Sequence, residues 1–282
     1  MTALWIALVT FIAGCVGTGI GGLIGALIKK DSSKIVSLLL SFAGGVMLAV
    51  VCFDLMQEAL TPSEGEEAIP FYWVVIFVLV GYGLVSLINY FVDKHANKEV
   101  PHSSSEEHPK THDDLDELIH ADHLAHHKGD NKALFIAGTI MAIVIALHNL
   151  PEGMVIGASY AIDPSVILGG SGLLVAVVIG LHNIPEGMAV SVPLIAGGTN
   201  KAKAVLLTAL SGLPTVLGAL LGYFLGSIGP LALSICLSLA SGAMLYVVFG
   251  ELLPESILMW KSKLPAAFLL IGLLVGFVLV LI

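Results

Sequence analysis

Residues 148–153 read His-Asn-Leu-Pro-Glu-Gly, and residues 182–187 read His-Asn-Ile-Pro-Glu-Gly. Each copy lies inside an apolar stretch that is long enough to cross a lipid bilayer. An ionisable side chain at that depth is costly, so its presence indicates a functional site. The histidine and the glutamate of each copy are four residues apart, which places them on one face of a helix. The motif therefore predicts two membrane helices that each present an imidazole and a carboxylate.

The proline of each copy adds backbone groups to this site. Pro151 and Pro185 have no N–H to donate, so the carbonyls of Leu147 and Leu181 are left free and each helix bends. Two imidazoles, two carboxylates, two amides and the freed carbonyls are then expected to meet at membrane depth. This set of groups is typical of a site for a divalent metal ion. The candidate ligands are His148, Asn149, Glu152, His182, Asn183 and Glu186.

The types of ligand restrict the metal. Imidazole and carboxylate without thiolate suit Zn(II), Fe(II), Mn(II), Cd(II) or Co(II), and they argue against Cu(I). Met47, in an earlier apolar stretch, is a candidate for an additional soft thioether ligand. A site that transports an ion must also release it, so a closed cage of four cysteines is not expected.

The composition is that of an integral membrane protein. Of the 282 residues 57% are hydrophobic and only 12% are charged, and the mean hydropathy is +0.97. Soluble domains are closer to half apolar and a quarter charged. The formal net charge is −9 and the sequence has no arginine, a balance that argues against nucleic acid as a partner.

Eight apolar stretches are each about 20 residues or longer, which is enough to span a membrane. They cover residues 2–28, 34–60, 70–92, 132–159, 165–196, 202–226, 230–257 and 264–282. We expect an all-α integral membrane protein with eight transmembrane helices. Residues 1–92 and 132–282 would form one membrane domain, and residues 93–131 a polar loop between its third and fourth helices.

The lysines predict how the chain is oriented. Every lysine falls in an odd-numbered connection: Lys29, Lys30 and Lys34; Lys94, Lys98, Lys110, Lys128 and Lys132; Lys201 and Lys203; Lys261 and Lys263. Positively charged loops stay on the cytoplasmic side of a membrane. We therefore expect a multi-pass protein of the plasma (cell inner) membrane, with cytoplasmic odd-numbered loops and both termini outside.

The polar loop at residues 93–131 holds eight of the ten histidines, interleaved with acidic residues. This composition favours a disordered linker. A histidine-rich tract also suits low-affinity metal binding, and the two interpretations are compatible. The candidate metal-binding residues of the loop are His120, His123, His126 and His127.

A second, weaker repeat links the two ends of the chain. Residues 41–48 (Ser-Phe-Ala-Gly-Gly-Val-Met-Leu) resemble residues 238–245 (Ser-Leu-Ala-Ser-Gly-Ala-Met-Leu), at an offset of 197 residues. The same offset pairs Asp54 with Glu251, Glu58 with Glu255 and Thr18 with Thr215. The lysines imply that paired helices cross in opposite directions, so the pattern predicts an inverted repeat, as in many secondary transporters. Thr215, Glu251 and Asp54 are candidates for an ion pathway.

Two other functions compete with metal transport. An intramembrane metalloprotease would need His-Glu-x-x-His, a string that the sequence lacks. A proton relay explains the histidines and the glutamates, but it gives no role to Asn149 and Asn183. Their carbonyl oxygens are good metal ligands and poor proton carriers. We expect a transporter and not an enzyme.

At these residues the sequence resembles the ZIP (Zrt/Irt-like) family of metal transporters. The resemblance covers the eight apolar stretches, the histidine-bearing loop and the two Pro-Glu-Gly motifs. His-Asn in the fifth stretch makes it similar to the GufA-like branch of that family. The resemblance implies transport of Zn(II) and related divalent ions toward the cytoplasm, without an organic cofactor. It also implies an elevator-like shift of helices 1, 4, 5 and 6 against the rest. The expected partners are divalent metal ions, the lipid bilayer and a second copy of the chain in a homodimer.

The resemblance also implies a binuclear site bridged by Glu152 and Glu186. The two motif histidines would belong to the first ion, with Met47 adjacent, and the two motif asparagines to the second. Two departures weaken the second position. Thr215 stands where another branch of the family has a glutamate, and Gly250 stands where that branch has a histidine.

Overall fold

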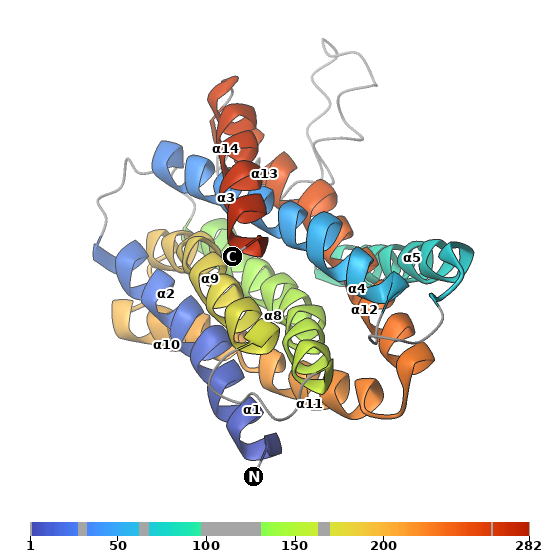
Figure 1. Ribbon diagram of the computed structural model, residues 1–282. Coiled ribbons are helices and arrows are strands. Elements are labelled where there is room, and N and C mark those ends of the chain that lie inside the picture. Colours follow the sequence, from blue (N-terminus) through green and yellow to red (C-terminus); the bar gives the residue numbers. More distant parts are fainter. Residues whose placement is uncertain are drawn as a thin grey trace.

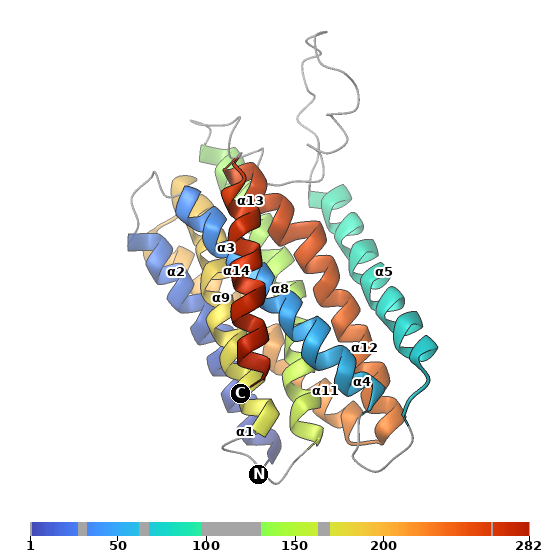
Figure 2. The same ribbon diagram turned by 45° about the horizontal axis from the view of Figure 1, so that its top comes forward.

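The computed structural model describes residues 2–27, 33–61, 68–96, 131–162, 170–260 and 262–281. Within these ranges the chain is helical and contains no β-strand. The helices form an elongated bundle of spans that cross one another at moderate angles (Figures 1 and 2). The predicted all-α membrane bundle is confirmed.

Each predicted apolar stretch is found as one helical span. Span 1 consists of α1 (Thr2–Phe11), the π-helical segment η1 (Ile12–Val16) and α2 (Gly17–Leu27), and span 2 of α3 (Ser33–Val50), η2 (Val51–Leu55) and α4 (Met56–Leu60). Spans 3, 4 and 5 are α5 (Phe71–Ala96), α8 (Asn131–Ile162) and α9 (Gly170–Ala196). Span 6 consists of α10 (Lys201–Ser211) and α11 (Pro214–Gly226), span 7 of α12 (Pro230–Tyr246), η3 (Val247–Leu252) and α13 (Leu253–Met259), and span 8 is α14 (Leu264–Val280).

Local sequence explains where several of these helices begin. The Asn200 side chain accepts a hydrogen bond of 2.9 Å from the Ala202 N–H and so caps α10. Helices α11, α12, α13 and α14 each have a proline in the first turn, where no N–H is needed. Among the described residues, seven spans are long and apolar enough to cross a membrane, and α14 is shorter.

The inverted repeat is visible in the packing. Spans 1 and 6 pack on spans 5 and 4, and spans 2 and 7 pack on spans 8 and 3. The irregular segments follow the same offset of 197 residues. The π-helical segment η2 of span 2 corresponds to η3 of span 7, and η1 of span 1 corresponds to the break after Ser211 in span 6. The sequence pattern did not predict these irregular segments.

Spans 1 and 6 meet at two glycines. A Cβ added to Gly14 would collide with the Gly212 carbonyl oxygen, and a Cβ added to Gly212 would collide with the Gly14 carbonyl carbon. No side chain fits at either position, so the backbones touch there, as is common where membrane helices cross. This crossing brings the two irregular segments together near the middle of the bundle.

The described lysines lie at one end of the molecule. Figure 2 shows the ends of α2 and α5 and the start of α8 toward that end, with both termini toward the other. Lys201 Nζ donates a hydrogen bond of 2.6 Å to the Ala26 carbonyl at the end of span 1, a favourable place for a cation. Lys34 Nζ lies 5.4 Å from the centre of the Trp260 ring. The structure thus has a loop end that bears these lysines and a terminal end.

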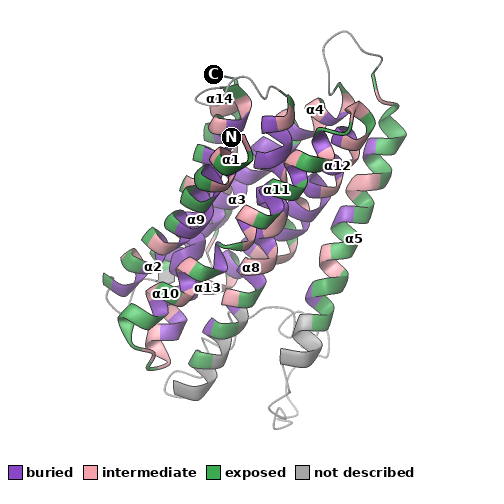
Figure 3. Cartoon of the chain, turned by 90° about the horizontal axis from the view of Figure 1, so that it is seen from below, coloured by how far each residue is buried: buried purple, intermediate pink, exposed green. Residues whose placement is uncertain are grey.

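Burial separates the central spans from the peripheral ones. Two thirds or more of the apolar windows of spans 2, 4, 5 and 7 are buried, against 11% for span 3. In Figure 3 the buried residues follow the middle of the bundle, and α5 lies at its edge with exposed residues along its length. Exposed apolar side chains on such a surface are expected where the surroundings are lipid. The motif-bearing spans 4 and 5 are therefore shielded from the lipid by their neighbours.

Candidate metal centre

Spans 4 and 5 pack against each other and each carries one copy of the motif. Both helices continue through the proline of the motif. The glycine that ends each motif permits close packing on a neighbouring span. A Cβ on Gly153 would collide with the carbonyl oxygen of Thr215, and a Cβ on Gly187 with that of Thr18. Thr18 and Thr215 are partners in the 197-residue repeat, so the two motifs have equivalent surroundings.

Three side chains of the two motifs come together in the bundle. His182 Nε2 lies 3.1 Å from Glu186 Oε1 and 3.5 Å from Glu152 Oε1. One ligand atom of each residue lies within 4.8 Å of the other two, and all three residues are buried. Zinc binds such ligands at about 2.0–2.2 Å, which places the ligands of a tetrahedral ion about 3.5 Å apart. The three groups are therefore close to the spacing that an ion requires. We call them the central group.

The central group is rich in unpaired negative charge. Both oxygens of Glu152 and one oxygen of Glu186 have no hydrogen-bond partner among the described residues. Buried carboxylates without a cation are costly, and a divalent ion would neutralise two of them. To bind the ion through Nε2, His182 must give up any proton that it shares with Glu186. The arrangement can hold a divalent cation through two carboxylates and one imidazole.

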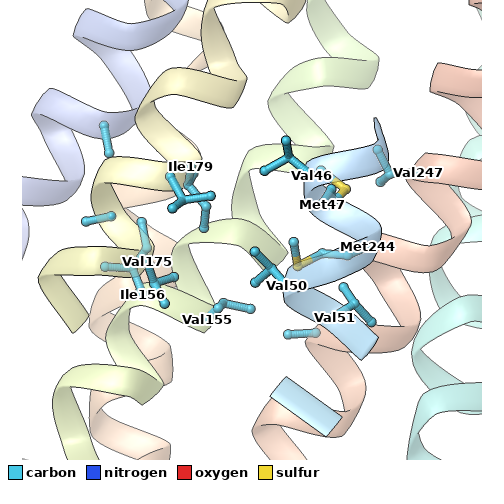
Figure 4. Close-up of a cluster of buried hydrophobic side chains, with 14 of the residues drawn as sticks. Val46, Met47, Val50, Val51, Val155, Ile156, Val175, Ile179, Met244 and Val247 are labelled. Carbon is cyan, nitrogen blue, oxygen red and sulfur yellow. The ribbon is translucent and has the colours of Figure 1, made fainter. Parts of the chain in front are cut away.

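A small cavity adjoins the central group on its terminal side, because the cavity residues Val178 and Ile179 precede His182 in α9, which begins at the terminal end. The cavity has a volume of about 10 Å³, enough for about one water molecule. Its lining consists of Val46, Met47, Val50, Val178, Ile179, His182 and Met244. Figure 4 shows Met47 and Met244 between spans 2 and 7, among the apolar side chains that face span 5. We call it the terminal-side cavity.

A second cavity lies on the loop side, because its residues Met141 and Ile145 precede His148 in α8, which begins at the loop end. Its volume is about 20 Å³. Its lining consists of His148, Glu251, Glu255 and the apolar residues Leu40, Met141, Val144, Ile145, Ala189 and Leu252. His148 is 3% exposed, and its Nδ1 has no hydrogen-bond partner among the described residues. We call it the loop-side cavity.

Glu251 is held in place by a neighbouring span. Asn89 of α5 donates hydrogen bonds of 2.5 Å to Glu251 Oε1 and of 3.0 Å to the Tyr246 hydroxyl. Asn89 is buried, so its amide needs these acceptors. The bonds fix the direction in which the Glu251 carboxylate enters the loop-side cavity.

The structure separates the predicted site residues. His182, Glu152 and Glu186 form the central group, whereas His148 lines the loop-side cavity and is not one of the three. The predicted neighbour Met47 lines the terminal-side cavity, and Glu251 the loop-side cavity. Asp54 lies in η2 and lines neither of these two cavities. The loop histidines His120, His123, His126 and His127 lie outside the described residues.

The other three predicted residues are joined to one another. Asn149, Asn183 and Thr215 are fully buried. The Asn149 side-chain oxygen accepts hydrogen bonds from Thr215 Oγ1 at 2.9 Å and from Asn183 Nδ2 at 3.3 Å. Thr215 therefore donates a hydrogen bond to a motif residue.

Sequence reasoning missed two cavity residues. Met244 lines the terminal-side cavity and Glu255 the loop-side cavity. The signal was present for Met244, because the 197-residue repeat pairs it with the candidate Met47, whereas Glu255 is paired with Glu58, which was not a candidate. A residue that the repeat pairs with a candidate ligand is itself a candidate.

The fold and the site together define a class of protein. An all-helical membrane bundle that buries two carboxylates and an imidazole between two cavities is suited to handle a divalent metal ion within the membrane. The family model described as ZIP Zinc transporter matches residues 2–282. The chain belongs to the ZIP family, and it is therefore a metal transporter of the membrane and not an enzyme.

Several bacterial relatives support this assignment. The chain is 34% identical over 253 residues to zinc transporter ZupT of Chlorobium chlorochromatii (strain CaD3), which covers 88% of this chain and 85% of the relative. It is 34% identical over 262 residues to zinc transporter ZupT of Clostridium perfringens (strain 13 / Type A), with the same coverage. It is 35% identical over 266 residues to zinc transporter ZupT of Campylobacter jejuni subsp. jejuni serotype O:2 (strain ATCC 700819 / NCTC 11168), with 88% and 86% covered. The similarity extends over almost the whole chain.

Proposed function

We propose that the protein carries divalent metal ions, zinc foremost, through the central group of Glu152, His182 and Glu186. The observation that supports this most strongly is the position of the group between two cavities, each with one motif histidine. An ion that enters from the terminal side meets His182 first, and an ion that leaves on the loop side passes His148. The relatives named zinc transporters make zinc the first candidate. Cd(II), Fe(II), Mn(II) and Co(II) suit the same ligands.

We propose a first ion position made of the central group with His148 as a further ligand and Met47 adjacent. This position would fill before a second one, because its two carboxylates provide the charge that a divalent ion needs. A second position beside the motif asparagines would be weaker. Thr215 offers it a neutral hydroxyl in place of a carboxylate.

Both cavities are too small for a hydrated ion, so transport requires helix movement. The hydrogen bonds between spans support two groups that move as units. Ser37 Oγ donates a hydrogen bond of 2.5 Å to the Ser256 carbonyl, and Ser41 Oγ one of 2.7 Å to Ser256 Oγ, which joins spans 2 and 7. The bonds of Asn149 and Asn183 join spans 1, 4, 5 and 6. We propose that spans 1, 4, 5 and 6 shift against the others along the apolar surface at the terminal-side cavity.

Liposomes that contain the purified protein are expected to accumulate zinc. Competition of Cd, Mn, Fe and Co with zinc uptake should rank these metals by the preference of the transporter. Uptake would be followed with a metal-sensitive dye, with and without a pH gradient, and protein-free liposomes would be the control. A protein that only binds metal would move nothing. Proton flux in the absence of every metal would favour the proton relay and contradict the proposal.

We propose that the loop end faces the cytoplasm of a cell whose plasma (inner) membrane holds the protein, and that both termini lie outside. Transport would then run from the terminal side toward the cytoplasm. The lysines at the loop end support this orientation, because positive charge is retained on the cytoplasmic side.

The orientation is tested with Ser104→Cys, after the three native cysteines are replaced by alanine. A membrane-impermeant thiol reagent is expected to label the introduced cysteine in permeabilised cells and to leave it unlabelled in intact cells. A cysteine introduced at Thr2, next to the outside terminus, is the matched control and should be labelled in both. Labelling of the Ser104→Cys protein in intact cells would reverse the orientation.

Four further proposals follow from the sequence. Residues 1–92 and 132–282 form one membrane domain, and the loop between them, whose residues 97–130 lie outside the described ranges, binds metal weakly. Two copies of the chain associate as a homodimer. Two ions can occupy the centre together, with Glu152 and Glu186 as bridges, when the second position is strengthened.

A further inference from the structure

Span 3 presents one narrow buried stripe to span 7. Among the residues of α5 whose burial the structure describes, only Val74, Gly81 and Asn89 are buried. They are seven and eight residues apart, which places them on one face of the helix, and α5 packs on α12. Asn89 is the one polar residue of these three. An apolar side chain would pack there at lower cost, so a buried amide at membrane depth indicates a function.

The amide of Asn89 joins two groups near the two ends of η3. Its Nδ2 donates to the Tyr246 hydroxyl, directly before this π-helical segment, and to Glu251 Oε1 within it. An amide nitrogen carries two N–H groups, so both donors of Asn89 are used. Tyr82 of α5 lies edge-on to the Tyr246 ring, with the ring centres 5.3 Å apart. Span 3 therefore supports the Glu251 carboxylate with contacts at two places along its helix.

The other half of the inverted repeat lacks this support. Span 8 packs on span 2 as span 3 packs on span 7, and Asp54 of η2 is the repeat partner of Glu251. Helix α14 contains no polar side chain, so it has no amide to donate to Asp54. The supporting amide is thus specific to the carboxylate of the loop-side cavity, which indicates a role for it there.

The loop-side cavity brings together ionisable groups of two spans. Glu251 and Glu255 are four residues apart on span 7, and both line the cavity with His148 of span 4. His148 is buried, and its Nδ1 has no hydrogen-bond partner among the described residues. A buried polar atom without a partner is costly, and a passing cation would satisfy it. Imidazole and carboxylate suit the same divalent ions as the central group. An ion that leaves the central group past His148 therefore meets the two carboxylates of span 7.

We propose that Asn89 is a positioning residue for ion release, which holds the Glu251 carboxylate where a cation that has passed His148 transfers to it. The hydrogen bond of 2.5 Å fixes the direction of the carboxylate. The ion then meets an oriented acceptor and not a side chain that must first turn toward it. This assignment rests on the proposed transport of a divalent cation, because release is a step of that transport.

The assignment is tested by zinc uptake into liposomes that contain the full-length Asn89→Leu protein. Loss of a group that orients a metal ligand costs about 10–100-fold, so the maximal uptake rate per inserted protein should fall about tenfold or more. The zinc concentration for half-maximal uptake should not rise, because the central group is unchanged. Ser86→Ala, a change at a partly buried polar residue of the same helix, is the matched control and should equal the wild type. Uptake by Asn89→Leu at the wild-type rate would overturn the assignment.

Two further experiments show whether Asn89 acts through Glu251. Tyr246→Phe removes only the other acceptor of the amide, so it should lower the melting temperature and leave the uptake rate close to that of the wild type. Asn89→Leu in a Glu251→Gln protein should cause little further loss, because the carboxylate that Asn89 positions is already absent. A full additional loss in that background would show that Asn89 supports the fold and not Glu251.

Asn89→Asp provides a readout that does not depend on transport. It places a third carboxylate beside Glu251 and Glu255, and carboxylates so close repel unless a cation lies among them. After equilibration with zinc and removal of the unbound metal, Asn89→Asp should hold about one ion more per chain than Asn89→Leu, since affinity follows the charge of the ligands. The same difference is expected in a Glu186→Gln background, in which the central group is weakened. Equal zinc contents of the two variants would show that the loop-side cavity does not receive the ion.

The outcomes separate this assignment from the proposed function. Unchanged uptake by a Glu186→Gln protein would refute transport through the central group. An inactive Glu186→Gln protein together with a fully active Asn89→Leu protein would refute only the role of Asn89.

Discussion

Replacing Glu186 by glutamine is expected to abolish metal uptake and to leave the protein folded. Glutamine has the size of glutamate and can still accept the hydrogen bond from His182, which is 3.1 Å long in the structure. It removes one of the two charges that face the ion. Changes to groups that only support a metal ligand cost about 10–100-fold, so the loss of a charged ligand should exceed about 100-fold. Glu152→Gln is expected to have the same effect.

The stability of the same variants separates loss of the site from loss of the fold. Two carboxylates within 4.8 Å of each other repel when no ion is present, so the metal-free Glu186→Gln protein should melt no lower than the wild type. Added zinc should raise the melting temperature of the wild type and not that of the variant, because only a bound ligand stabilises.

Ser159→Ala is the matched control for this experiment. Ser159 is a buried polar residue of the same helix as Glu152, and it lines neither of the two cavities. Metal uptake by the Ser159→Ala protein, and the response of its melting temperature to zinc, should equal those of the wild type. Uptake at the wild-type rate in a correctly inserted Glu186→Gln or Glu152→Gln protein would rule out the central group as the transport site.

The arrangement of spans could be predicted because the membrane restricts the chain. Backbone groups in lipid must bond within their own segment, so each apolar stretch between polar connections had to be a helix. The 197-residue offset also predicted which helices correspond, and the structure confirms it in the paired irregular segments η2 and η3. The offset was read from side chains such as Met47 and Met244, which occupy equivalent places on spans 2 and 7.

The different positions of the two motif histidines could not be predicted from the sequence. Both copies have the same residue types at the same spacing, so the sequence treats His148 and His182 alike. Their surroundings differ because span 4 faces Glu251 and Glu255 of span 7 at the loop-side cavity, and span 5 faces Met47 at the terminal-side cavity. The surroundings of the two histidines depend on neighbouring spans, so they cannot be predicted from the motif alone.

The hydrogen-bond partner of Thr215 could not be predicted from the sequence either. A threonine in a membrane helix usually bonds to a carbonyl of its own preceding turn, as Thr18 does. Thr215 follows the break in span 6, which turns its hydroxyl to Asn149 of span 4. Only the break, which no local pattern predicted, makes this contact available.

Thr215→Glu is expected to create a second ion position beside the first. In the wild type the Thr215 hydroxyl occupies the Asn149 oxygen through a hydrogen bond of 2.9 Å. A glutamate removes that donor, frees the oxygen of Asn149 and adds a carboxylate on the same side. Two divalent ions about 4 Å apart repel strongly and need carboxylates around them. Glu152 and Glu186 provide two formal charges against four, and the substitution provides a third.

The metal content of the purified protein measures this effect. After equilibration with zinc, the wild type should hold about one ion per chain and Thr215→Glu about two, as in two-metal sites with bridging carboxylates. Uptake by Thr215→Glu should be slower, because a more strongly bound pair of ions is released less readily. Thr215→Gln is the matched control, since it has the same size without the charge, and it should hold the same amount of zinc as the wild type. A crystal with low zinc or cadmium and density only between Asn149 and Asn183, away from His148 and His182, would reverse the order in which we expect the positions to fill.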